Sequence, residues 1–93
     1  MPLKVEMVSA DHTWWTGEAL SVSAPAADGS MGVLTGHQPV LAVLRPGIVR
    51  IRPSSGEPVS MEVDGGFLSV DENEVTIVVD PTTEQDRPAT GEN

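Results

Sequence analysis

Cysteine and tyrosine are absent from this 93-residue chain, which has one phenylalanine and two tryptophans. Without cysteine there is neither a disulfide framework nor thiolate chemistry, so a hydrophobic core must hold the fold, as suits a reducing compartment. No segment approaches the roughly 18 apolar residues that a membrane span needs. The opening residues 1–6 lack the basic region and apolar run of a signal peptide. We therefore expect one small cytoplasmic domain.

Basic residues are scarce as well. Five Lys and Arg stand against fourteen Asp and Glu, which gives a net charge of −9. A surface this acidic repels the phosphates of nucleic acids and the head groups of anionic lipids. The composition therefore predicts no nucleic-acid partner and no direct insertion into lipid.

Proline and glycine are frequent, with 8 and 9 copies, and they interrupt the chain too often for long helices. Between them, short segments alternate apolar and polar residues, which is the period of a strand with one buried face. Such strands are predicted at 3–7, 20–23, 31–34, 40–52 (two strands), 59–63, 67–70 and 75–79. About eight short strands with turn residues between them indicate an all-β protein, an antiparallel sandwich or flattened barrel.

The turn residues give more local predictions. In 45–47, Arg-Pro-Gly has Pro and Gly where a type II turn needs them, so a hairpin is expected there. Its outgoing arm should place Arg50 and Arg52 on the face opposite the apolar residues. Pro25 should end a strand, and residues 64–66 should turn the chain.

The C-terminal stretch 81–93 contains no large apolar side chain and is rich in Thr, Glu, Pro and Gly. It cannot bury enough surface to offset the entropy of ordering. The sequence therefore predicts a folded domain over 1–80 and a flexible polar tail over 81–93.

Catalytic or metal-binding constellations are not found in the sequence. His12 and His37 lie in different turns, with no third ligand at a suitable spacing, so neither a metal site nor a cofactor is expected. The serines lie on strand faces or in polar turns, without a nucleophile-elbow motif. Nothing in the sequence therefore supports an enzyme.

Two features favour a binding surface, each with an alternative. The rings of Trp14 and Trp15 should point to opposite sides of a strand, so one of them either folds back over the sandwich edge or faces a partner. Arg45, Arg50 and Arg52 are three of the five basic residues and fall within eight positions. They form a contact patch or a solvated face paired with carboxylates such as Glu62.

Several motifs occur in a specific order: Val8-Ser9-Ala10-Asp11, Gly29-Ser30-Met31-Gly32, Gly36-His37-Gln38-Pro39-Val40-Leu41, Pro46-Gly47, Gly65-Gly66-Phe67-Leu68 and Asn73-Glu74-Val75-Thr76-Ile77. In this order they resemble the epsilon subunit of bacterial rotary ATP synthases, and the match runs over residues 3–80. Thr35 and Gln38 depart from the family's usual proline and small residue.

The resemblance implies an antiparallel β-sandwich of two five-stranded sheets at the foot of the central stalk. Such a subunit is non-catalytic, binds the gamma subunit and the membrane rotor ring, and couples proton flow to ATP synthesis at the cytoplasmic face of the bacterial membrane. The family usually continues into a helical hairpin that restrains hydrolysis and in some members binds ATP. The polar stretch 81–93 is not such a hairpin, so neither hairpin-based inhibition nor nucleotide binding is expected.

Contact residues follow from the resemblance as expectations. The rotor-ring candidates are Ser30, Met31, His37 and Gln38, and the gamma candidates are Val40, Leu41, Arg45, Arg50 and Arg52. The alternative function from another class is a free-standing β-sandwich binding module for protein or carbohydrate, the latter through Trp14 or Trp15.

Overall fold

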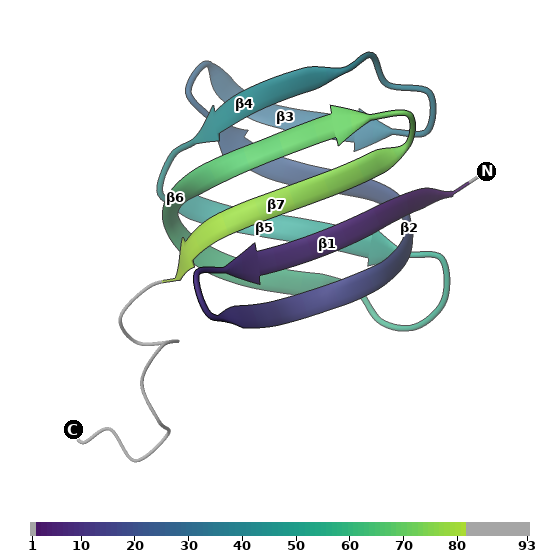
Figure 1. Cartoon of the computed structure of the whole chain (residues 1–93), viewed down its shortest axis with the longest axis horizontal. Coiled ribbons are helices and arrows are strands. Elements are labelled where there is room, and N and C mark those ends of the chain that lie inside the picture. Colours follow the sequence, from purple (N-terminus) through teal and green to yellow (C-terminus); the bar gives the residue numbers. More distant parts are fainter. Residues whose placement is uncertain (1, 82–93) are drawn as a thin grey trace.

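The computed structural model describes residues 2–81. It contains seven strands and, over those residues, no helix, which confirms the predicted all-β class (Figure 1). The strands are β1 (Leu3–Ser9), β2 (His12–Ala26), β3 (Gly29–Leu34), β4 (Val40–Leu44), β5 (Gly47–Pro53), β6 (Val59–Asp71) and β7 (Glu74–Pro81). The tail predicted over 81–93 lies outside the described residues, apart from Pro81 at the end of β7.

The strands form one curled sheet in the order β1-β7-β6-β4-β2-β3, with β5 bridging β2 and β6. The additional pairing of β1 with β2 closes the sheet into a flattened barrel, and β3 extends it beyond β2. All pairs are antiparallel except β1 with β7, which is parallel. In Figure 1, β4, β6, β7 and β1 form the front layer, while β3 and β5 lie behind.

Seven strands are enough to form a two-layered sandwich because two of them, β2 and β6, are long and each pairs with several neighbours. The first part of β2, a 15-residue strand, pairs with β1, and its later part pairs with β3 and β5. The 13-residue β6 pairs first with β5 and then with β4 and β7. The prediction that a strand ends at Pro25 was wrong by one residue, because β2 continues to Ala26.

The predicted turn at 64–66 is also wrong. Gly65 and Gly66 lie inside β6, where the register with β7 shifts between Val63 and Gly66. Their φ angles of +135° and +143° belong to a bulge, a local kink that lets β6 bend from one layer into the other. Glycine is needed here because a side chain disfavours positive φ.

The predicted hairpin at 45–47 is wrong too, because the strands before and after it both pair with β6. β4 and β5 both pair with β6, Leu44 opposite Gly66 and Gly47 opposite Val63, so they run in line instead of side by side. The corner between them is held by the Arg45 N–H, which donates to the Pro25 carbonyl at 2.7 Å. Gly47 does not have the positive φ of a type II turn; a Cβ there would lie 2.9 Å from Cγ of Pro25.

The core follows the predicted alternation. Leu3, Val5 and Met7 of β1 are buried, as are Val75, Ile77 and Val79 of β7. On β5, Val49 and Ile51 face inward and Arg50 and Arg52 face solvent, as predicted. The remaining buried apolar residues are Ala19, Val22, Ala24, Val33, Leu44, Met61, Val63, Leu68 and Val70. One continuous core therefore fixes which side chains each layer presents outward.

Candidate interaction surfaces

The four rotor-ring candidates fall into two groups. Ser30 is exposed and Met31 half-buried at the start of β3, beside the turn that joins it to β2. His37 and Gln38 follow the other end of β3, in the connection to β4. Since a six-residue strand is roughly 20 Å long, the structure does not bring all four side chains together.

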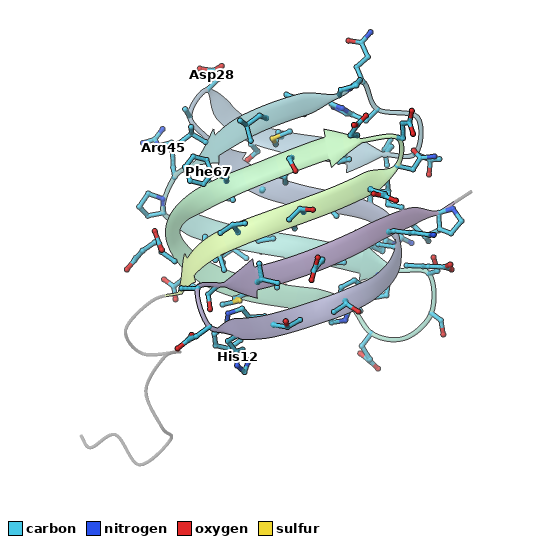
Figure 2. The ribbon with its side chains drawn as sticks, in the orientation of Figure 1. His12, Asp28, Arg45 and Phe67 are labelled. Carbon is cyan, nitrogen blue, oxygen red and sulfur yellow. The ribbon has the colours of Figure 1, made fainter. Side chains whose placement is uncertain are left out.

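The five gamma candidates are divided between two layers. Val40 is half-buried and Leu41 is 71% exposed on β4. Arg45 lies at the corner after β4, and Figure 2 shows it at the same end of the barrel as Asp28 and Phe67. Arg50 and Arg52 project from β5, in the other layer. The three arginines therefore do not form one patch.

A surface that the sequence reasoning missed lies on the outer face of β4, β6 and β7. Val43 pairs with Phe67, which pairs with Val78, and their side chains are 57%, 51% and 41% exposed. Leu41 lies two residues along the same face, and the half-buried Val8 of β1 pairs with Val78. We call Val8, Leu41, Val43, Phe67 and Val78 the apolar stripe.

The sequence did contain a signal for the apolar stripe. Adjacent apolar residues on a strand, such as Phe67-Leu68 and Ile77-Val78-Val79, must place one member outward because side chains alternate between faces. What the sequence lacked was the cross-strand register that gathers these outward members in one row. A contiguous exposed apolar patch of this kind is typical of an interaction site.

The two tryptophans lie near the start of β2 and are half-buried. The β1–β2 pairing shifts between Met7 and Val8, and this bulge leaves Trp14 without a cross-strand partner. Both rings are half-buried and pack against the core, so the expectation that they point to opposite sides was wrong. The Trp14 Nε1–H donates to Ser9 Oγ at 3.0 Å, and the Trp15 ring covers Gly17.

Two open hollows mark the surface. One, of about 470 Å³, lies along β1 between β2 and β7 and is lined by Lys4, Glu6, Glu18, Glu74 and the threonines beside them. The other, of about 410 Å³, lies between the β2–β3 turn and β4 and is lined mainly by small and apolar residues. Within residues 2–81, no three His, Asp or Glu side chains converge as metal ligands. In the same range no helix is long and apolar enough to cross a membrane.

A small all-β barrel whose outer face carries a row of apolar side chains across neighbouring strands is typical of domains that bind other proteins. The sequence comparison identifies which one. The family described as the ATP synthase Delta/Epsilon chain β-sandwich domain matches residues 2–85. The chain belongs to this family, which confirms the resemblance given by the motifs.

Individual relatives support the same family assignment. An ATP synthase epsilon chain of Streptomyces avermitilis is 46% identical over 78 residues, which are 84% of this chain and 63% of that relative. An ATP synthase epsilon chain of Frankia casuarinae is 43% identical over 81 residues, 86% of this chain and 94% of that one. The chain thus spans less than two thirds of the Streptomyces relative and nearly all of the Frankia one.

A solved structure supports the fold. A chain in the cryo-EM structure of the Euglena gracilis mitochondrial ATP synthase, comprising OSCP, F1 and c-ring, superposes with a TM-score of 0.77. The two are 24% identical, and the match covers 84% of this chain and 50% of the other. At this identity the likeness shows a shared β-sandwich fold.

Proposed function

We propose that residues 1–80 form the docking domain of a non-catalytic central-stalk subunit, which joins the gamma subunit to the rotor ring of a proton-translocating ATP synthase. Membership of the family supports this assignment. The observation that carries it is the apolar stripe, because exposed apolar rows are stabilised when a partner covers them. In this role the chain works as a peripheral protein at the cytoplasmic face of a bacterial membrane.

The gamma subunit is the proposed partner of the apolar stripe. Leu41 was a gamma candidate from the sequence and belongs to it, while Arg45 follows β4 at its edge. Arg45 is exposed and adds a cation at the polar rim that such interfaces usually have. Arg50 and Arg52 lie in the opposite layer, where their cross-strand neighbours include Ser21, Ser23 and Ser60, so we assign them to no gamma contact.

The rotor ring is the proposed partner of the β2–β3 turn and the β3–β4 connection. Ser30 and Gln38 are exposed, and Met31 and His37 are half-buried. All four are therefore accessible at the periphery of the barrel, although Met31 also packs against the core. The carbohydrate-binding alternative is not favoured, because both tryptophan rings pack against the core instead of offering an open face.

Replacing Ser30 and Met31 together with arginine should weaken coupling of proton flow to ATP synthesis. Ser30 is exposed, and Met31 is half-buried and packs against the core. The aliphatic stem of an arginine can take the place of the methionine side chain while its charged end reaches solvent, so the chain should still fold. Proton-driven ATP synthesis in membrane vesicles should fall by at least about fivefold, since a bulky charge in an interface costs more than about 1 kcal/mol. The same double change at Ser54 and Ser55, which are exposed in the β5–β6 connection, is the matched control.

Equal synthesis by the two double variants would count against the ring assignment. The gamma assignment has its own measurement, a titration of the purified chain with the gamma subunit. A stable complex is expected, and a chain that stays monomeric beside gamma would overturn the stalk function altogether.

A further inference from the structure

Asn73 joins three segments that are distant in the sequence. It lies in the two-residue turn between β6 and β7, where Glu72 and Asn73 have φ angles of +50° and +65°. Its backbone carbonyl accepts the Lys4 N–H of β1 at 2.8 Å. Its side-chain Oδ1 accepts the Gly36 N–H of the β3–β4 connection, also at 2.8 Å. Since a backbone N–H only donates, the amide oxygen must be the atom that faces Gly36.

The Gly36 N–H belongs to a turn with a defined geometry. The His37 N–H donates to the Leu34 carbonyl at 3.1 Å, which closes a four-residue turn over 34–37. Gly36 is the third residue of that turn and has a φ of +87°, as a type II turn requires. Type I and type II turns differ by a flip of the central peptide, here the one that joins Thr35 to Gly36.

The bond from Asn73 acts on this central peptide. In the type II form its N–H points at Asn73 Oδ1, whereas a flip would turn it away and bring the Thr35 carbonyl oxygen toward that oxygen. The side chain of Asn73 therefore favours one of the two orientations. His37 and Gln38 follow directly, and the His37 Nδ1 lies 2.7 Å from the Gln38 carbonyl, so their placement depends on how the turn leaves Gly36.

We propose that Asn73 is a positioning residue for the β3–β4 connection: it fixes the orientation of the Thr35–Gly36 peptide and thereby the direction in which His37 and Gln38 are presented. The significance of that direction for a partner rests on the proposed function, in which these residues meet the rotor ring. The bond joins residues 37 positions apart, and no sequence pattern around either residue predicts it.

Two substitutions at position 73 separate this role from general stability. Asn73→Gly tolerates the positive φ and removes the acceptor, while Asn73→Asp tolerates the positive φ and keeps an oxygen in place. In the full chain, the Gly36 amide should exchange with solvent about fivefold faster in Asn73→Gly, the factor that corresponds to one hydrogen bond of about 1 kcal/mol. In Asn73→Asp it should exchange as slowly as in the wild type.

The Lys4 amide is an internal control, because its acceptor is the backbone of residue 73 and both variants retain it. Unchanged exchange of Gly36 in Asn73→Gly, or equal acceleration at Lys4 and Gly36, would overturn the proposal. These measurements use the isolated chain and need no partner. Their failure is thus distinct from failure of the stalk function, which the titration with gamma reports.

A second readout tests the consequence for coupling. ATP synthesis in vesicles should fall by at least twofold with Asn73→Gly and be restored with Asn73→Asp. The free energy of unfolding of Asn73→Gly should fall by no more than the roughly 1 kcal/mol of one hydrogen bond, so the variant remains folded in the assay. Wild-type synthesis by Asn73→Gly, despite a faster Gly36 amide, would refute a role of the turn's orientation in coupling.

Discussion

Gly66→Ala is expected to unfold the domain or to lower its free energy of unfolding by more than about 4 kcal/mol. A Cβ at this position would overlap the carbonyl oxygen of Val78 and lie 2.8 Å from the Cα of Val79. Both are backbone atoms of β7, a strand held by pairing with β1 and β6. The neighbours therefore cannot move aside as the end of a flexible side chain can, and the φ of +143° adds strain.

Urea unfolding followed by tryptophan fluorescence measures the effect. Domains of this size are stabilised by about 5–15 kcal/mol at most, so a loss above about 4 kcal/mol leaves a large unfolded fraction near room temperature. Circular dichroism without urea shows whether the β structure survives at all.

Gly65→Ala is the matched control. Gly65 is the adjacent residue of the same bulge, with a φ of +135°, but a Cβ there meets only the Leu44 carbonyl at an ordinary 3.5 Å. The loss in free energy of unfolding for Gly65→Ala should therefore be that of the unfavourable φ alone, about 1–3 kcal/mol. Equal losses in the two variants would show that crowding against β7 does not decide the effect.

The bulge also shows where the sequence was insufficient. Gly-Gly after an acidic residue is compatible with a turn between two strands and with a bulge inside one long strand, because both use positive φ. Only the register distinguishes them: β6 keeps pairing on both sides of residues 64–66. The same holds for Gly47, whose small size serves packing against Pro25 instead of a turn.

Local alternation of apolar and polar residues was enough to predict the inward side chains where one face of a strand is buried and the other is exposed to solvent. The inward residues of β1, β5 and β7 were correctly predicted from their period of two. The order of turn motifs was enough to indicate the family, because that order runs along most of the chain. Neither kind of signal contains cross-strand register, so the apolar stripe and the bond between Asn73 and Gly36 could not be predicted.

Phe67→Glu is expected to weaken binding of the gamma subunit by at least about 30-fold, the factor that corresponds to 2 kcal/mol at an interface hot spot. Phe67 lies in the middle of the apolar stripe, between Val43 and Val78. A carboxylate there would be buried without a partner when gamma covers the stripe, which is strongly unfavourable. In the free chain the side chain is 51% exposed, so the substitution should leave the barrel folded.

Leu34→Glu is the control that isolates the position of the charge. Leu34 is 63% exposed on β3 and pairs with Ser21, away from the apolar stripe. Both variants add one negative charge to a chain of net −9, so long-range repulsion from an acidic partner changes equally in the two. Calorimetric titration should give a dissociation constant for Leu34→Glu within about threefold of the wild type. If the two variants lose affinity equally, gamma binds through general electrostatics or another face, because a docking surface centred on Phe67 cannot be indifferent to a buried carboxylate at its centre.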